Sequence, residues 1–248
     1  MTSPTLVGVS LKMYFGHAQT LDWIARVGEL ARTHPAVVDG TVELFVIPSF
    51  VSIVPTIAAL EGSSVLVGAQ DLATEDSGAF TGEVSGAELA EVGVRVVEVG
   101  HAERRSLFGE TDEIVAAKTR AALRNGIAPV LCIGESTKTS PADAAAECLR
   151  QLASALEGAA DGRVIVAYEP VWAIGAAHPA GPDYVSAVCR ELHAAVADRP
   201  GSAVIYGGSA GPGLLSGLGT DVDGIFLGRF AHDPAALERV LDEAGARA

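Results

Sequence analysis

Short apolar segments recur eight times along this chain, and amphipathic stretches separate them. Each apolar segment is nearly continuous, a pattern typical of parallel strands that are covered on both faces. The predicted strands are residues 6–9, 44–47, 65–67, 94–99, 129–133, 164–168, 203–206 and 225–227. The clearest predicted helices are residues 18–32, 112–123, 141–156, 184–196 and 234–243. Asp233 is predicted to cap the last helix, and Asn125-Gly126 to end the second.

Eight strand–helix units in 248 residues predict one α/β domain over residues 1–248, folded as a (β/α)8 barrel. A doubly wound open sheet is the alternative. That fold usually carries a GxGxxG turn after its first strand, where this chain has Ser10-Leu11-Lys12-Met13. In a barrel, the functional side chains lie at the C-terminal ends of the strands.

The composition narrows the classes of function. A net charge of −14 argues against nucleic acid as a partner, because nucleic acid needs a basic face. The chain has no long uncharged apolar run and no basic region followed by one, so we expect a cytoplasmic protein with no membrane segment. Cys132, Cys148 and Cys189 show no paired spacing, so we expect neither a disulfide framework nor a cysteine-based zinc site.

Two strand ends carry residues suited to proton transfer. Glu169 ends the sixth apolar run, where a carboxylate is costly to bury unless it is solvated or paired. Such surroundings raise the pKa of a glutamate, which suits a general base near neutral pH; a structural ion pair with an arginine is the alternative. His101 begins a predicted helix at 102–107, whose positive end favours a neutral imidazole that donates to a carbonyl. A packing role is the alternative for His101.

Other strand ends suit an anion. Lys12 follows the first strand in a chain whose other lysines are Lys118 and Lys138 alone. A cation there can hold an anion or stabilise an oxyanion, and an ordinary surface lysine is the alternative. Backbone N–H groups at glycine-rich strand ends form phosphate cradles, and ordinary turns are the alternative for these residues: Gly175, Gly207, Gly208, Ser209 and Gly228. Together these strand ends predict proton abstraction next to a carbonyl in a small phosphorylated sugar.

Several ordered segments resemble the triosephosphate isomerase family over nearly the full chain. They are residues 67–70, 78–83, 100–105, 108–110, 131–135, 168–175 and 206–209. The resemblance implies a TIM barrel and a sugar-phosphate isomerase that works through an enediolate, with no metal or organic cofactor. It implies that Glu169 shuttles the proton, His101 polarises the carbonyl, and Lys12 binds the anionic substrate with support from Glu103.

The resemblance also implies a phosphate site, a lid and a homodimer. Gly175, Ser209 and Gly228 would hold the phosphate, and Arg229 would either grip it or face solvent. Residues 170–172 would form the near hinge of a lid that closes over the site, and residues 173–175 its tip. Family members pair through the loop after the third strand, which here would carry Thr81 into the partner's site.

The chain departs from the family pattern near the site. Ser10 stands in place of the usual asparagine, Ala102 in place of a serine, and Arg229 in place of a glycine. Residues 176–179 replace the usual far side of the lid, and Pro179 stiffens it. Serine for asparagine opens space beside the reacting carbons, which would admit one more hydroxymethyl group.

With this extra room the substrate would be a four-carbon ketose phosphate, and a further resemblance implies conversion of L-erythrulose 1-phosphate to D-erythrulose 4-phosphate. Residues 10–13 and 228–231 are similar to those of erythrulose-phosphate isomerases of tetritol breakdown, a branch of the family. One alternative is neutral drift in a triosephosphate isomerase of glycolysis, which converts dihydroxyacetone phosphate to glyceraldehyde 3-phosphate. Another is a barrel that binds sugar phosphates without catalysis.

Overall fold

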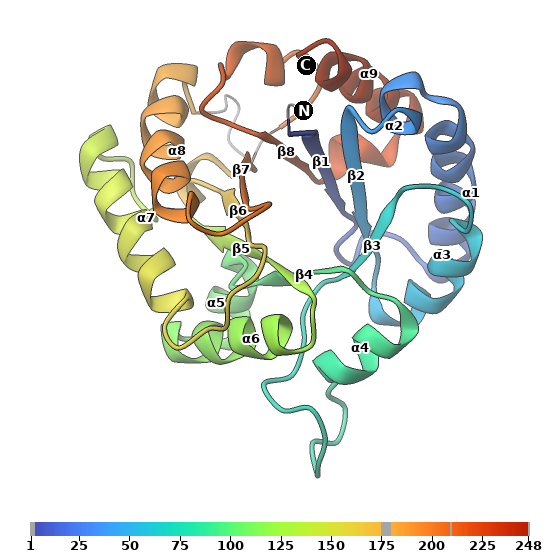
Figure 1. The fold of residues 1–248 in the computed structure, drawn as a ribbon, viewed down its shortest axis with the longest axis horizontal. Helices are drawn as coiled ribbons and strands as arrows, with labels where there is room; N and C mark the ends of the chain where they lie inside the picture. Colours follow the sequence, from blue (N-terminus) through green and yellow to red (C-terminus); the bar gives the residue numbers. More distant parts are fainter. Residues whose placement is uncertain (1–2, 175–179, 209, 248) are drawn as a thin grey trace.

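Eight parallel strands close into a barrel in chain order (Figure 1). The computed structural model describes residues 3–174, 180–208 and 210–247. The strands are β1 (Thr5–Ser10), β2 (Val42–Ile47), β3 (Leu66–Ala69), β4 (Val96–Val99), β5 (Ala128–Ile133), β6 (Ile165–Tyr168), β7 (Ala203–Tyr206) and β8 (Gly224–Leu227). Pairing of β1 with both β2 and β8 closes the ring, which confirms the predicted barrel and excludes the open sheet.

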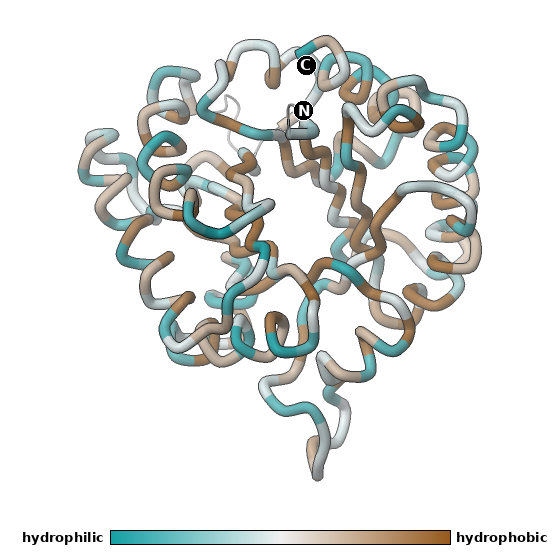
Figure 2. The backbone as a smooth tube through the Cα atoms, in the orientation of Figure 1, coloured by the Kyte–Doolittle hydropathy of each residue, from teal (hydrophilic) through white to brown (hydrophobic). Residues whose placement is uncertain are grey.

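Helices surround the barrel, with apolar residues toward the strands (Figure 2). They are α1 (His17–Thr33), α2 (Pro35–Val38), α3 (Ile53–Ala59), α4 (Gly86–Val92), α5 (Ala102–Phe108), α6 (Asp112–Arg124), α7 (Pro141–Ala155), α8 (Pro182–Val196) and α9 (Pro234–Gly245). Single 3-10 turns lie at Phe50–Ser52, Val171–Ala173, Leu215–Gly217 and Arg229–His232. No helix in the described parts of the chain is long and apolar enough to span a membrane.

The predicted elements are confirmed with small changes at their ends. The Asp233 carboxylate accepts the N–H of Ala235 at 3.0 Å, as predicted for the cap of α9. Strand β4 begins two residues later than the predicted 94–99, because the N–H of Val94 bonds to Leu89 in the exit turn of α4. The prediction lacked α2, α3 and α4, which are too short to show a clear helical period.

The barrel interior is filled by one cluster of side chains that comes from the strands alone. Its buried members are Leu6, Phe45, Ile47, Val96, Val130, Cys132, Ile165, Ala167, Ala203, Ile205 and Phe226. Side chains two residues apart on a strand share a face. Ser10, Glu98 and Glu169 therefore continue the inward face at the C-terminal ends of β1, β4 and β6. Three polar residues thus stand above an apolar core.

Candidate active site

Lys12, His101 and Glu169 meet at the C-terminal ends of β1, β4 and β6. The Lys12 Nζ atom lies 2.6 Å from His101 Nε2, which lies 3.4 Å from Glu169 Oε2. Lys12 has a left-handed backbone with φ of 47°, which a non-glycine residue rarely adopts. The Gln70 side chain fixes this turn, since its Nε2 atom donates to the Lys12 carbonyl at 2.9 Å.

His101 is a neutral imidazole in this site. Its Nδ1 atom accepts the backbone N–H of Glu103 at 3.1 Å, so the ring proton sits on Nε2. Burial lowers the pKa of His101, and the charge of Lys12 lowers it further, to about 3. Both Nε2 of His101 and Nζ of Lys12 are then donors. Their proximity marks the point at which a substrate oxygen would accept hydrogen bonds from both.

Glu169 has the burial and the raised pKa that a general base would need. Its side chain is 8% exposed, and burial raises its pKa to about 7, although Lys12 opposes this shift. Its position depends on Gly207, because a Cβ atom there would lie 2.5 Å from Glu169 Cγ. The N–H of Gly207 donates to the Tyr168 carbonyl at 2.9 Å. Gly207 therefore makes room for the base and does not contribute its N–H to a phosphate cradle, which corrects the sequence-based expectation.

Lys12 carries the positive charge of the site. Glu103 Oε2 lies 3.5 Å from its Nζ atom, so the structure brings together the predicted supporting pair. Burial lowers the pKa of Lys12, but the carboxylates of Glu98, Glu169 and Glu103 outweigh it and raise the pKa above its usual value. An ammonium group that stays charged is what an anionic substrate requires in a chain of net charge −14.

Two adjoining pockets open at these residues. A small one of about 50 Å³ is lined by Ser10, Lys12, His101 and Glu169, among others. A larger one of about 400 Å³ shares Lys12, Gly208 and Gly228 with it and adds Arg229, which follows β8. The small pocket suits reacting carbons and the larger one a phosphate group.

The predicted phosphate residues are only partly within the described structure. Gly228 and Arg229 line the larger pocket, and the exposed Arg229 guanidinium lies 6.0 Å from the Tyr14 ring centre. The predicted residues Gly175 and Ser209 lie outside the described residues, as do the substituted lid positions 176–179. Thr81 is exposed on the segment between β3 and α4, which extends away from the barrel in Figure 1. Within one chain the structure does not bring Thr81 to the site.

Glu135 anchors the segment that follows Glu169, a role the sequence analysis did not assign. Its buried carboxylate accepts hydrogen bonds from Trp172 Nε1 at 2.7 Å, Tyr184 at 2.9 Å and Tyr168 at 3.2 Å. Its backbone carbonyl accepts the N–H of Val171 at 3.0 Å. Glu135 therefore holds the near hinge predicted at 170–172.

Glu98 is a second carboxylate that the sequence analysis did not assign. Its Oε2 atom accepts the Ser10 hydroxyl at 2.8 Å, and both residues are buried. Burial raises the pKa of Glu98 to about 7, and Lys12 and the Ser10 hydrogen bond oppose this shift. Glu98 and Glu135 lie at or just after the ends of apolar strands. The signal that identified Glu169 would have found both.

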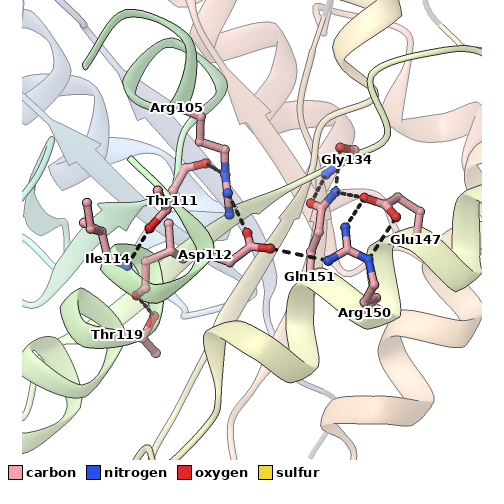
Figure 3. Close-up of polar contacts among 11 residues, drawn as sticks. Arg105, Thr111, Asp112, Ile114, Thr119, Gly134, Glu147, Arg150 and Gln151 are labelled. Carbon is pink, nitrogen blue, oxygen red and sulfur yellow. Dashed lines mark hydrogen bonds and ion pairs between the residues drawn. The ribbon is translucent and has the colours of Figure 1, made fainter. Parts of the chain in front are cut away.

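A cavity of about 460 Å³ lies beside the site, between α5, the end of β5 and α7, and Glu169 reaches its wall. Figure 3 shows charged side chains there: Arg105 donates to Asp112 at 2.7 Å, and Arg150 to Glu147 at 2.6 Å. Arg150 also donates to Asp112 at 3.4 Å, which links the two pairs. Since both arginines already have acidic partners, this cavity suits phosphate less well than the pocket at Lys12.

Comparisons with a family model and with known proteins point to the same family. A family model described as triosephosphate isomerase matches residues 5–244. An L-erythrulose-1-phosphate isomerase of Pectobacterium atrosepticum is 54% identical over 96% of this chain and 95% of its own length. A triosephosphate isomerase of Symbiobacterium thermophilum is 42% identical over 83% of this chain and 86% of its own. An L-erythrulose-1-phosphate isomerase of Rhizobium etli is 41% identical over 91% and 86%.

A base with a raised pKa, a neutral imidazole and a cation at one barrel mouth can move a proton between neighbouring carbons of an anionic substrate. The fold and this arrangement of side chains fit an isomerase. The matched family model and the relatives show which family this is. The chain belongs to the triosephosphate isomerase family and is a sugar-phosphate isomerase of that family.

Proposed function

We propose that this isomerase converts L-erythrulose 1-phosphate to D-erythrulose 4-phosphate. The observation that carries this choice is Ser10 on the wall of the small pocket beside Lys12, His101 and Glu169. Its short side chain leaves more room at the reacting carbons than the asparagine usual in the family. The names of the relatives from Pectobacterium atrosepticum and Rhizobium etli support the same substrate.

The proposed reaction uses the three residues in fixed roles. Glu169 takes the proton from C3, and the electrons of the C3–H bond form the C2=C3 double bond of an enediolate. The negative charge on the C2 oxygen is stabilised by His101 Nε2–H and by Lys12. The C3 hydroxyl proton then moves to the C2 oxygen, and Glu169 returns the abstracted proton to C2, which leaves a hydroxyl group at C2 and the carbonyl at C3. The phosphate would sit at Gly175, Ser209, Gly228 and Arg229.

The second candidate substrate is dihydroxyacetone phosphate, which the intact Lys12, His101 and Glu169 would also serve. The two are separated by measuring kcat/KM of the purified protein on L-erythrulose 1-phosphate and on dihydroxyacetone phosphate. We expect a large advantage for the four-carbon sugar. An advantage for the triose would make the protein a triosephosphate isomerase, and binding without turnover of either would make it a non-catalytic barrel.

Replacing Ser10 with asparagine is expected to move this preference toward the triose. Asparagine is larger, so it fills the space that the extra hydroxymethyl group needs. We expect the kcat/KM ratio of triose to tetrulose phosphate to rise by roughly 10-fold or more, the scale of one misfitted group in a pocket. Equal losses on both substrates would show general damage instead.

We infer that the protein acts as a homodimer. Exposed apolar side chains gather on the first three loops of the barrel: Met13, Tyr14, Phe50, Val51 and Phe80. The loops are tied together by Gln70 bonding to Lys12 and by His17 bonding to Ser52. Such apolar surfaces mark protein–protein contacts, and Thr81 would then enter the partner's site.

Substituting Phe80 with aspartate is expected to weaken this contact, because it places a charge in an apolar interface. Sedimentation velocity should show a dimer for the unmodified chain and a larger monomer fraction for the variant. A monomeric unmodified protein with full activity would contradict the inference.

We also propose that residues 1–248 form one domain and that the protein acts in the cytoplasm. The family model spans residues 5–244, which supports one domain. The three cysteines are buried free thiols, which suits a reducing compartment.

A further inference from the structure

Glu98 is a buried carboxyl group with no role in the reaction proposed for Glu169, His101 and Lys12. It is 3% exposed, on the inward face of β4, above Val96 in the barrel core. Burying a carboxyl group costs free energy unless hydrogen bonds or charges compensate. Among the described residues, Ser10 is the hydrogen-bond partner that the structure gives it. A carboxyl group with one such partner keeps acceptor capacity for a ligand.

Ser10 connects Glu98 to the reacting pocket. The serine lines the small pocket together with Lys12, His101 and Glu169, while its hydroxyl donates to Glu98. The phosphate would lie on the side of Arg229, which lines the larger pocket and not the small one. A substrate that spans both pockets therefore directs its non-phosphorylated end to the inward wall at Ser10.

We propose that Ser10 and Glu98 form the subsite for the terminal hydroxymethyl group of the four-carbon substrate. This inference rests on the proposed function, and it names the residues that determine specificity within it. The terminal hydroxyl donates to the Glu98 carboxyl group or to the Ser10 oxygen, whose own proton is held by Glu98. In dihydroxyacetone phosphate the reacting carbon bears a hydrogen in place of this hydroxymethyl group, so the triose cannot use these contacts.

The pair also explains why an acidic residue stands beside the base. Burial and the nearby Glu169 raise the pKa of Glu98, and Lys12 and Ser10 lower it. In either protonation state a carboxyl group hydrogen-bonds to a hydroxyl: the anion accepts, and the acid accepts or donates. Glu98 can therefore bind the substrate hydroxyl group whether the proton is on Glu98 or on Glu169.

The test combines a protein variant with a substrate variant. Kinetics are measured for the unmodified protein and for Glu98→Val, on L-erythrulose 1-phosphate and on its analogue with hydrogen in place of the C4 hydroxyl. The unmodified protein should favour the hydroxylated substrate by roughly 10- to 100-fold, the scale of a hydrogen bond to a charged group. Glu98→Val should lose most of that preference, and Glu98→Gln should keep part of it.

Controls separate this subsite from a general loosening of the barrel. Val96→Ala changes the same inward face one layer below and should lower kcat/KM on both substrates by the same factor. Glu98→Val should lower kcat/KM on L-erythrulose 1-phosphate by a larger factor than on dihydroxyacetone phosphate, since only the four-carbon substrate loses a hydrogen bond. If Glu98→Val kept the full preference for the substrate with the C4 hydroxyl, the proposed subsite would be wrong, while the proposed function would stand. A clear preference of the unmodified protein for dihydroxyacetone phosphate would overturn the proposed function, and the subsite with it.

Discussion

Replacing Glu169 with aspartate is expected to lower kcat by roughly 10²- to 10⁴-fold, the range that a positioned general base contributes. The shorter side chain withdraws the carboxylate by about 1.5 Å, one carbon–carbon bond. Gly207 and the backbone packed around Glu169 are fixed, so the chain cannot follow to restore the distance. Steady-state kinetics on the preferred substrate measure the effect, and KM should change far less than kcat because the phosphate contacts remain.

Glu91→Asp is the matched control, because it makes the same change at an exposed position of α4. Its kcat should equal that of the unmodified protein. Near-equal kcat values for Glu169→Asp and the unmodified protein would remove Glu169 as the base.

The pH profile adds a second test of the same residue. Only the carboxylate form of Glu169 can accept a proton, and burial raises its pKa to about 7. Activity should therefore rise as pH increases through about 7 and fall below it. His101 stays neutral throughout, because its pKa is lowered to about 3. A profile flat from pH 5 to 8 would contradict a raised pKa for the base.

Much of this site could be predicted because a barrel brings all strand ends to one mouth. Glu169, His101 and Lys12 each stand at the end of an apolar run, so knowing the fold was enough to group them. The sequence could not show what each end contacts across the barrel. Ser10 and Glu98 are 88 positions apart, and their hydrogen bond depends on both side chains facing inward at the same height.

Gly207 shows the same limit of prediction from sequence. Gly207 follows a strand and fits a phosphate cradle in sequence, yet its N–H is already bonded within the barrel and its missing Cβ makes room for Glu169. Glu135 was part of a recognised segment, but its role depends on Trp172 and Tyr184, which come from later segments of the chain. Such roles depend on contacts between segments that are far apart in the sequence, and local sequence patterns do not show these contacts.

Replacing Lys12 with methionine is expected to lower kcat/KM by roughly 10²- to 10³-fold on any sugar phosphate, the effect of losing one donor to a developing oxyanion. Methionine keeps much of the side-chain length and removes the charge. Three carboxyl groups near Lys12, of Glu98, Glu103 and Glu169, would then lack the ammonium that offsets them. KM should rise and kcat should fall, because the charge stabilises both the bound anion and the enediolate.

The same variant should move the pH profile in a defined direction. Lys12 lowers the pKa of Glu169, so its removal raises that pKa and shifts the fall in activity to a pH above 7. Arg95→Met is the matched control: it removes one positive charge from an exposed position just before β4, at the opposite end of the barrel. That control should leave both the rate and the profile unchanged. If Lys12→Met lowered the rate but left the profile in place, the lysine would act on the substrate alone, and its electrostatic link to the base would be refuted.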